Sequence, residues 1–268
     1  MPELPEVETV VRTLEGMIQG EAIREVEVLF PKMIDRSPEA FRQQLIGRHF
    51  LRFSRRGKYL LFYLEDVLLV SHLRMEGKYW LKNETEPLEK HTHVIFTFES
   101  GMQLRYHDTR KFGTMELLPV DTDLTHFHGL GPEPFSDAFS EAYIYETAHH
   151  RNTPVKSLLL DQSFAAGIGN IYADEICFAC GIRPGRNAKR LSRAQCGMIS
   201  RETRRILSEA IRAGGTTIRS YTSSLGVSGL FQLECMVHTK KTCMICGGEI
   251  RHRRIGGRTS YYCPFCQK

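Results

Sequence analysis

Long apolar runs are missing from this chain, and so are the biased tracts that mark unusual protein classes. The longest run of apolar and aromatic residues, Tyr59 to Leu64, is far shorter than the roughly 20 residues of a membrane-spanning helix. There is no internal repeat and no low-complexity segment, and only one tryptophan among 268 residues. With 41% hydrophobic and 25% charged residues, the composition excludes disordered and collagen-like chains. It predicts a globular protein long enough for two domains.

The first residues also lack the features of a secretory signal. The stretch MPELPEVETVV carries acids where such a signal carries bases followed by an apolar segment. We therefore expect a protein that remains in the cytosol, with no membrane partner and with reduced cysteines.

Charge is divided unevenly along the chain. The net charge is +5, but residues 1–150 hold 17 Lys and Arg against 24 Asp and Glu, whereas residues 151–268 hold 19 against 7. The two halves therefore carry −7 and +12. A basic half of this size favours an anionic partner, most simply a nucleic acid, because neutralised phosphates release counterions. Solubilising side chains on helices would give the same count, so charge alone leaves both readings open.

The pattern of apolar residues changes twice along the chain. Apolar residues recur at three- and four-residue steps through 5–18, which predicts a helix. From about 23 to 118, short β-rich runs follow one another without an intervening helix, which predicts an antiparallel sandwich or barrel. After a linker rich in proline and glycine the pattern turns helical, and a short basic module follows. We predict an α+β fold with domains at 1–131, 132–234 and 235–268.

Four of the eight cysteines have the spacing of a metal site. They form two Cys-x2-Cys pairs separated by sixteen residues, namely Cys243, Cys246, Cys263 and Cys266. This spacing is typical of a four-thiolate zinc site, whereas two disulfides are rare in chains without a secretory signal. We therefore predict one structural Zn²⁺ that holds a hairpin too small to fold alone. Cys177 and Cys180 form another Cys-x2-Cys, in an apolar helical stretch, and are predicted to be buried thiols.

Pro2, with Glu3 after it, is a candidate reactive group. A small residue after the initiator Met normally permits removal of that Met, which exposes a secondary amine. An α-amino group has a pKa near ~7.7–8, against ~10.4 for lysine, so part of it is neutral and nucleophilic at physiological pH. Such an amine can attack a sugar anomeric carbon and give an iminium, while Glu3 moves protons as the glycosidic bond opens. Proline and acids at a helix start also satisfy capping and dipole rules, so the pattern alone leaves both readings open.

Several co-linear motifs resemble those of the formamidopyrimidine-DNA glycosylases. They are MPELPEVETVVRTLEG, RGKYLLF, SHLRMEGKY, DTRKFG, DQSFAAGIGNIYADE and the finger ending YYCPFCQK. The resemblance runs from Met1 to Lys268, and Leu4 and Val7 favour this branch over the endonuclease VIII-like sister group. It implies an N-terminal antiparallel β-sandwich with a leading helix, then a helical helix–two-turn–helix domain with a C-terminal four-cysteine zinc finger.

The activity that the resemblance implies is bifunctional. A monomer would excise oxidised purines, chiefly 8-oxoguanine and formamidopyrimidines, from double-stranded DNA and then cut the strand at the abasic site by β,δ-elimination. Two alternatives remain at this point. One is a catalytically silent protein that binds damaged DNA on the same scaffold, and the other is the same chemistry with a preference for oxidised pyrimidines.

The resemblance assigns four residues to catalysis. Pro2 matches the nucleophile that forms the Schiff base, and Glu3 matches the general acid/base that opens the deoxyribose ring. Lys58 matches a lysine that assists β-elimination and contacts phosphate. Arg258, among the glycines of the finger tip, matches an arginine of the later elimination. From residue type alone, Lys58 is equally a solvated strand lysine and Arg258 an exposed turn arginine.

The resemblance also assigns residues that hold DNA with one nucleotide extruded, which costs a few kcal/mol of unstacking. Three residues match the positions that fill the space left by the extruded nucleotide, namely Met75, Arg110 and Phe112. For the two apolar residues, packing in the protein core is the alternative. Further DNA contacts match His72, His93, Arg151, Lys156 and Asn170. The lesion pocket matches Glu76, Ser220 and Tyr221, the last two in a loop that closes over the extruded base.

Two segments depart from the family pattern. The usual DPRRFG is DTRKFG here, so residues 108–113 lack a rigid proline while the spacing of Arg110 and Phe112 is kept. A Tyr-Gly-Arg stretch that commonly precedes the finger is replaced by residues 237–240, VHTK. A phosphate contact at that stretch is therefore in doubt.

Overall fold

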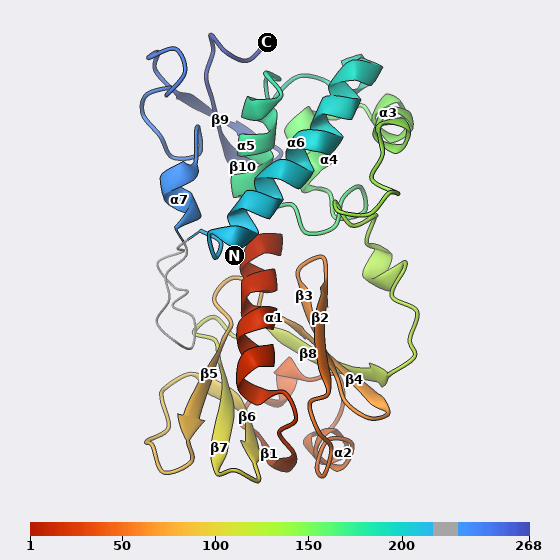
Figure 1. The fold of residues 1–268 in the computed structure, drawn as a ribbon, viewed down its shortest axis with the longest axis vertical. Coiled ribbons are helices and arrows are strands. Elements are labelled where there is room, and N and C mark those ends of the chain that lie inside the picture. Colours follow the sequence, from red (N-terminus) through yellow and green to blue (C-terminus); the bar gives the residue numbers. More distant parts are fainter. Residues whose placement is uncertain (217–229) are drawn as a thin grey trace. The chain divides into compact units, whose positions relative to one another are not determined.

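The computed structural model describes residues 1–216 and 230–268, which divide into two compact units (Figure 1). The first comprises Met1–Leu124 together with the segment that begins at Thr216, and the second comprises Thr125–Gly215 and Leu230–Lys268. The domain limits expected from the sequence, after residues 131 and 234, stay a prediction. In the described residues, no helix is both long and apolar enough to cross a membrane.

The first unit is built on two four-stranded antiparallel sheets, so the predicted β-sandwich is confirmed. One sheet has the strand order β1-β6-β7-β5 and the other β2-β3-β4-β8. The strands are β1 (Ile23–Val28), β2 (Arg52–Arg56), β3 (Tyr59–Tyr63), β4 (Val67–His72), β5 (Lys78–Asn83), β6 (Thr92–Phe98), β7 (Met102–His107) and β8 (Thr114–Pro119). Between β1 and β2 lie the short helices η1 (Pro31–Met33) and α2 (Pro38–Gln43).

The leading helix α1 (Leu4–Ile18) packs against β2 and β3. Pro5 stands in its first turn, where a missing N–H costs nothing, and the Glu6 side chain accepts the main-chain N–H of Glu3 at 2.8 Å. The apolar stripe expected from the sequence is buried in one core with the inner faces of both sheets. Burial of that stripe fixes the orientation of the helix and therefore the position of the chain's first residues.

In the β2-β3-β4-β8 sheet, the strand register brings several loops to one end of the sandwich. Arg56 pairs with Tyr59, Tyr59 with His72, and His72 with Thr114. The row formed by these residues ends the sheet, because β2 and β4 stop there while β3 and β8 start there. The β2–β3 turn, the turn after β4 and the loop that precedes β8 therefore emerge side by side. Figure 1 shows the β2–β3 turn and the start of α1 at this same end.

Two glycines at this end leave room for the ring of Tyr106. A Cβ on Gly113 would lie 1.7 Å from the Tyr106 hydroxyl oxygen, and one on Gly77 would lie 2.1 Å from it. The tyrosine is fully buried, so its ring has no free space to enter. The loops before β5 and before β8 are therefore locked to one another through a single aromatic side chain.

We expect Gly113→Ala to lower the free energy of unfolding by about 1–3 kcal/mol, because the new methyl group forces the buried Tyr106 ring to move. Urea unfolding of the two proteins measures the difference. The matched control is Gly16→Ala in α1, where a Cβ meets nothing within 4 Å and alanine should be neutral or stabilising. Equal effects of the two substitutions would contradict this account of the loop lock.

The second unit is mainly helical and ends in a small β-hairpin. Its helices are α3 (Glu141–His149), α4 (Val155–Leu160), α5 (Asn170–Ala179), α6 (Arg193–Arg212) and α7 (Phe231–Glu234), with the one-turn helices η2 (Phe127–Gly129) and η3 (Ala188–Arg190). The hairpin joins β9 (Arg251–Ile255) to β10 (Arg258–Tyr262). Its base packs on α5 through an apolar cluster of Phe178, Val237 and Ile250 with two of the finger cysteines. The finger therefore shares a core with the helices.

Candidate functional site

The predicted nucleophile and its neighbour lie in front of α1. Pro2 is buried and the Glu3 side chain is 3% exposed. An ion pair between Arg55 of β2 and Glu8 of α1, with Nε and Oε2 2.9 Å apart, fixes the first turns of the helix against the end of β2. The chain's start is thereby placed at the end of the sandwich where the loops gather.

Glu6 is a site residue that the sequence analysis missed. It is 2% exposed, and its two carboxylate oxygens have different tasks. Oε2 accepts the main-chain N–H of Glu3, and Oε1 accepts the N–H and the hydroxyl of Thr216 at 2.8 and 3.0 Å. One buried carboxylate therefore links the candidate reactive terminus to the residue at which the predicted lesion-capping loop begins. In the sequence, the role of Glu6 could be suspected only from the repeated acids of PELPEVE. Acids are also common at the start of a helix, so this pattern does not single out Glu6.

Lys58 lies in the tight turn between β2 and β3. Gly57 precedes it with φ 57°, as the first position of a two-residue hairpin loop requires. The lysine is only 6% exposed, so it is not the solvated strand lysine that the sequence left as the alternative. Its turn directly adjoins the row that ends the second sheet.

The two predicted histidines are both buried, and their contacts differ. His72 is 7% exposed and ends β4, where its Nδ1 accepts the N–H of Arg74 at 2.9 Å. In the neutral ring Nε2 then carries the hydrogen. His93 is 5% exposed, and its Nε2 lies 2.8 Å from the main-chain oxygen of Asp108. The structure therefore gives His93 the task of supporting the loop before β8.

Asp108 explains how that loop keeps its shape without the usual proline. It is fully buried and accepts three main-chain N–H groups at 2.9 Å, from Arg110, Phe112 and Gly113. The turn presents Arg110 and Phe112 outward, with the guanidinium carbon 4.7 Å from the ring centroid and 51% of Phe112 exposed. Phe112 is therefore not core packing, the alternative that the sequence left open.

The turn after β4 carries the remaining predicted residues of this end. Met75 and Glu76 are both half-buried there, directly after Arg74, whose φ is 51°. Ser220 and Tyr221 lie outside the described residues.

Asn170 begins α5 after a turn that is organised by Gln162. The side-chain amide of Gln162 donates to the main-chain oxygens of Leu160 and Ile168 and accepts the N–H of Gly167, which has φ 92°. Asn170 is half-buried, and its Oδ1 has no hydrogen-bond partner among residues 1–216 and 230–268. The N–H groups at the start of a helix favour an anion in general, and the assignment of Asn170 to a DNA contact stays a prediction. Gln162, within the DQSFAAGIGN motif, was not singled out from the sequence.

Arg151 lies close to that turn. Its guanidinium pairs with Asp161, which also accepts the N–H and the hydroxyl of Ser163 at 2.9 and 2.7 Å. Although burial opposes ionisation, these hydrogen bonds lower the pKa of the Asp161 carboxyl. The Arg151 side chain keeps 38% exposure and remains available to a partner.

Lys156 occupies a different place from the one that the resemblance implies. Its side chain is fully buried, with Nζ 2.7 Å from Oδ1 of Asp174 and 3.0 Å from the main-chain oxygen of Thr259. Thr259 directly follows Arg258, so Lys156 fastens the finger hairpin to α5. A direct DNA contact is inconsistent with this burial, because the ammonium group already has two protein acceptors.

The acids of α5 bind the segment that leads into the finger. Oδ2 of Asp174 lies 2.8 Å from Nδ1 of His238, and the Glu175 carboxylate accepts the N–H groups of Met236, Val237 and His238 at 2.7–3.1 Å. Burial nevertheless raises the pKa of Glu175. The segment that departs from the family pattern is thus anchored by two buried carboxylates. In the sequence, these two anchoring residues could have been suspected because they form an acidic pair inside the apolar run of α5.

Arg258 stands at the tip of the hairpin. Gly256 and Gly257 form the two-residue turn with φ values of 55° and 77°, the pattern of a turn that needs positive φ at both positions. A Cβ on Gly256 would lie 2.6 Å from the Ser157 hydroxyl, so the tip rests against α4. Arg258 itself is exposed.

The four finger cysteines converge as the sequence predicts, and they can hold a metal ion. Their sulfurs lie within 4.8 Å of one another, with separations of 3.7 Å for Cys243 and Cys266 and 3.5 Å for Cys246 and Cys263. A tetrahedral centre with bonds near ~2.3 Å places its sulfurs about 3.8 Å apart. Burial opposes ionisation of Cys243, but main-chain N–H groups of Cys246 and Ile245 lower its pKa to about 7.

The other cysteines are buried. Burial raises the pKa of the Cys177 thiol well above its ordinary value, that of Cys180 to about 12 and that of Cys196 to about 11. Thiols with such values are almost fully protonated at neutral pH and react slowly. The expectation of buried, unreactive thiols at 177 and 180 agrees with these contacts.

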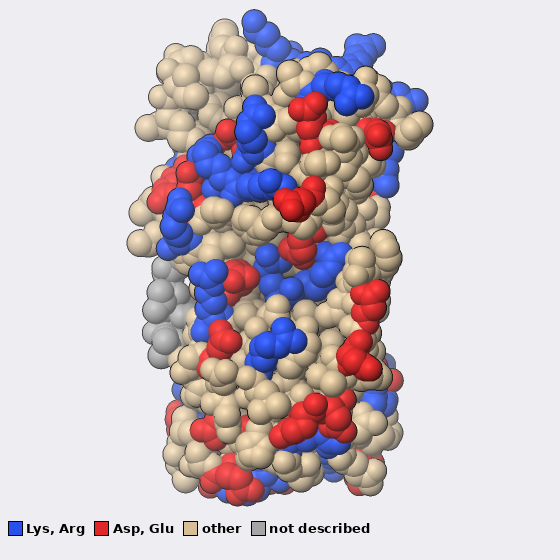
Figure 2. All heavy atoms as spheres, turned by 45° about the vertical axis from the view of Figure 1, so that its right-hand side comes forward, with Lys and Arg blue, Asp and Glu red and all other residues tan. Residues whose placement is uncertain are grey.

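Charged side chains are distributed unevenly over the surface (Figure 2). On the face drawn there, Lys and Arg side chains spread over much of the second unit, whereas Asp and Glu gather at the lower end of the first. The difference runs in the same direction as the −7 and +12 of residues 1–150 and 151–268, although the two units have other limits. The acids of the first unit thus gather in patches.

Comparison with known proteins gives consistent matches along the whole chain. Residues 1–115 match the model of the formamidopyrimidine-DNA glycosylase N-terminal domain, and residues 130–222 match the model of the formamidopyrimidine-DNA glycosylase H2TH domain. The formamidopyrimidine-DNA glycosylase of Bacillus licheniformis is 48% identical over 274 residues, covering 100% of both chains. That of Bacillus subtilis is 46% identical over 273 residues, covering 100% of this chain and 99% of the relative.

Solved structures agree. Lactococcus lactis Fpg in complex with N7-benzyl-Fapy-dG DNA superimposes with a TM-score of 0.93 at 40% identity over 100% of both chains. The same protein with DNA that contains an abasic site gives a TM-score of 0.94 at 40% identity over 99% of each chain. The predicted resemblance is therefore confirmed, and this chain belongs to the formamidopyrimidine-DNA glycosylase family.

Proposed function

We propose that this chain removes oxidised purines from duplex DNA through an iminium formed by Pro2 and then cuts the strand. As a family member it is a DNA glycosylase of base excision repair, with the AP lyase activity of that family. The lesion class, the residues and the order of steps are the proposed part. The relatives compared here are bacterial, and we place the reaction in the bacterial cytosol.

One observation carries the proposal. The sheet register and the Arg55–Glu8 pair bring the chain's start, Lys58 and the loop with Arg110 to the same end of the first unit. These segments are separated by some fifty residues each along the sequence, and the fold places them together on rigid elements. A rigid support of this kind is what covalent catalysis on an extruded nucleotide needs.

The chemistry follows from the groups at this end. In a chain that begins at Pro2, the neutral secondary amine attacks C1′ of the extruded nucleotide, the bond to the base breaks, and the base leaves with a proton. Glu3 protonates the ring oxygen so that the sugar opens to the iminium. Removal of a proton from C2′ then expels the 3′ phosphate, with Lys58 close to the charge that develops. Arg258 would bind phosphate in the second elimination, which frees the 5′ phosphate.

The gap in the duplex is filled by the exposed loops. Phe112 and Met75 offer apolar surface to the neighbouring bases, and Arg110 offers hydrogen-bond donors to the orphaned base. These contacts offset the few kcal/mol of unstacking and a bending cost of order 1–6 kcal/mol. Glu76 remains our candidate for the lesion pocket, and Asn170 and Arg151 for backbone contacts.

The metal ion of the finger is proposed to be Zn²⁺. Four thiolates without an open position suit structural zinc, which would hold the hairpin that carries Arg258. We expect a chelator that strips the metal to unfold the finger and to weaken DNA binding by at least roughly tenfold. Atomic absorption should find one zinc per chain, and Cys263→Ser should copy the effect of the chelator. A metal-free protein with unchanged binding would contradict the assignment.

The test of the proposed function is a duplex with one 8-oxoguanine opposite cytosine. Purified protein should release the base and leave a one-nucleotide gap with phosphate at both ends. A matched duplex with an oxidised pyrimidine should react more slowly. Faster reaction of the pyrimidine duplex would reverse the proposed preference, and duplex binding without scission would show a silent damage binder instead.

A further inference from the structure

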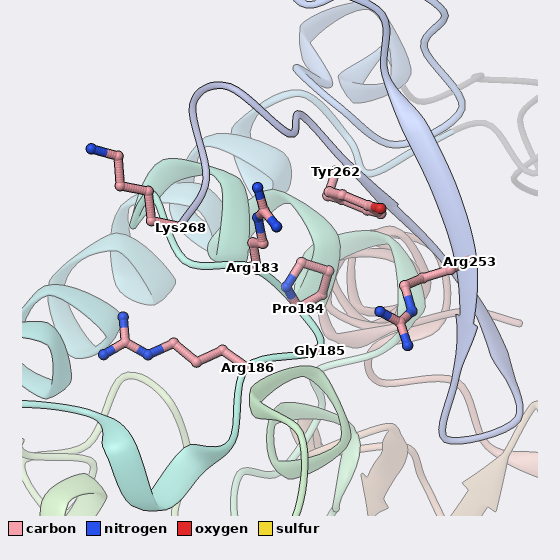
Figure 3. A pocket seen from close by; sticks show the side chains of 7 residues that line it. All are labelled: Arg183, Pro184, Gly185, Arg186, Arg253, Tyr262 and Lys268. Carbon is pink, nitrogen blue, oxygen red and sulfur yellow. The ribbon is translucent and has the colours of Figure 1, made fainter.

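A cavity in the second unit is lined by four cationic side chains (Figure 3). They are Arg183, Arg186, Arg253 and Lys268. Among the described residues, no Asp or Glu side chain lines the cavity, whose volume is about 230 Å³. Figure 3 shows the side chains of Arg186 and Lys268 extending away from Arg253, so Arg183 and Arg253 are the cations that we consider for a bound anion.

The walls of the cavity come from segments far apart in sequence that main-chain bonds hold together. The N–H of Arg183 donates to the Lys268 oxygen at 3.0 Å, and the N–H of Lys268 donates to the Gly181 oxygen at 2.9 Å. The Arg183 side chain donates to the main-chain oxygens of Gln267 and Pro264 at 2.9 and 3.0 Å. Its guanidinium is thereby oriented, with further N–H donors left over.

Arg253 reaches the cavity from β9. Figure 3 shows its guanidinium turned toward the loop of Pro184 and Gly185, with the ring of Tyr262 nearby. A Cβ on Gly185 would lie 3.8 Å from a terminal nitrogen of Arg253, so the guanidinium lies next to this loop at ordinary contact distance. The Arg253 side chain has no hydrogen-bond or ion-pair partner in the portion of the chain that the structure describes, and the residue is exposed.

The size and the chemistry of the cavity limit the ligand. Ligand pockets for drug-sized molecules are roughly 300–1,000 Å³, so 230 Å³ suits one phosphate-sized anion and part of a sugar. Arginine forks match phosphate oxygens in pairs. Proline and tyrosine supply an apolar wall for the rest of a phosphate ester.

The hairpin register indicates where that phosphate comes from. Arg258 pairs with Ile255 and Ser260 pairs with Arg253, so Arg253 and Arg258 lie on one face of the hairpin, two residues apart along it. Two strand residues span about 7 Å, so the two arginines can reach phosphates that are close to each other on one DNA strand. A strand that meets Arg258 therefore has a phosphate within reach of the cavity.

We propose that this cavity binds a backbone phosphate of the DNA strand, close to the phosphate at Arg258. The inference rests on the proposed function, since it takes lesion-containing duplex as the ligand. Free phosphate has the same chemistry and is the other possible source.

The experiment compares Arg253→Gln with Arg254→Gln. Arg254 is the matched control, because it is the next residue of β9, faces the opposite side and makes only a 3.3 Å bond to the Gly257 oxygen. Binding of an 8-oxoguanine duplex is measured over a range of salt. We expect Arg253→Gln to weaken binding roughly three- to tenfold and to reduce the log–log salt slope by about 0.9, with wild-type values for the control.

Duplexes with one neutral methylphosphonate then locate the contact. A single position should weaken wild-type binding and leave Arg253→Gln unaffected. The proposal is overturned if Arg253→Gln binds the unmodified duplex as tightly as the wild type. It is overturned equally if every methylphosphonate position weakens both proteins alike, or if none weakens the wild type.

In the third measurement, the wild-type protein is titrated with inorganic phosphate alone, and the amide signal of Gly185 is followed by NMR. A shift without any coupled duplex position would assign the cavity to free phosphate and overturn the DNA assignment. These failures are distinct from failure of the proposed function, in which the wild type would neither bind nor cut the duplex.

Discussion

Retaining Met1 should abolish the covalent chemistry, although the chain is otherwise unchanged. With Met1 present, the nitrogen of Pro2 belongs to an amide whose lone pair is delocalised, so it cannot attack C1′. With Met1 removed, Pro2 carries a free secondary amine. We expect borohydride-trapped adduct and strand scission to fall by about a thousandfold or more in the chain that keeps Met1. Gel shifts of the reduced adduct on an abasic duplex measure the difference.

The comparison includes its own control, because both forms share every other residue and should bind the duplex alike. Pro2→Gly offers a second form, in which a primary amine replaces the proline ring in front of a buried Glu3; it should trap far less adduct. Undiminished trapping with Met1 retained would mean that another amine is the nucleophile. Lys58 would then be the first residue to examine.

Lys156→Met should be the most destabilising single substitution in the finger-bearing unit. The methionine keeps the length of the side chain but leaves Asp174 buried beside His238 without the ammonium group, and it removes the bond to Thr259. Breaking a buried ion pair from one side costs about 3–5 kcal/mol. Urea unfolding measures the loss, and disorder of the hairpin should weaken DNA binding along with it.

A double variant separates this structural role from a DNA contact. Lys156→Met with Asp174→Leu removes both charges, so a large part of the lost free energy should return. The slope of binding against salt should stay at its wild-type value in the double variant, since no phosphate contact is removed. A slope reduced by about 0.9 would show that Lys156 does meet a phosphate, as the resemblance implies and the structure does not.

The architecture could be predicted because its signals are local. Alternation over short runs gave the sandwich, three- and four-residue steps gave α1, and the spacing of the cysteines gave a finger whose sulfurs converge. The sequence pattern left the role of Phe112 open, because residue type alone does not tell whether an aromatic side chain is exposed or buried in the core. The loop held by Asp108 leaves 51% of Phe112 exposed, so the residue is not part of the core, and its contact with DNA stays a prediction.

What the sequence did not give depends on partners that are distant along the chain. Glu6 and Thr216 are 210 residues apart, and Lys156 and Thr259 are 103 apart. No periodicity reports such pairs, and a lysine in a motif reads as a surface cation until its burial is known. The cavity at Arg253 belongs to the same class, because its walls combine residues 183–186 with the end of the finger.

Mass spectrometry of the reduced adduct tests the central claim most directly. The protein is incubated with an abasic duplex and borohydride, digested, and the DNA-derived mass is located on a peptide. We expect it on the peptide that begins with Pro2, at its nitrogen. A modified lysine and an unmodified Pro2 would contradict the account.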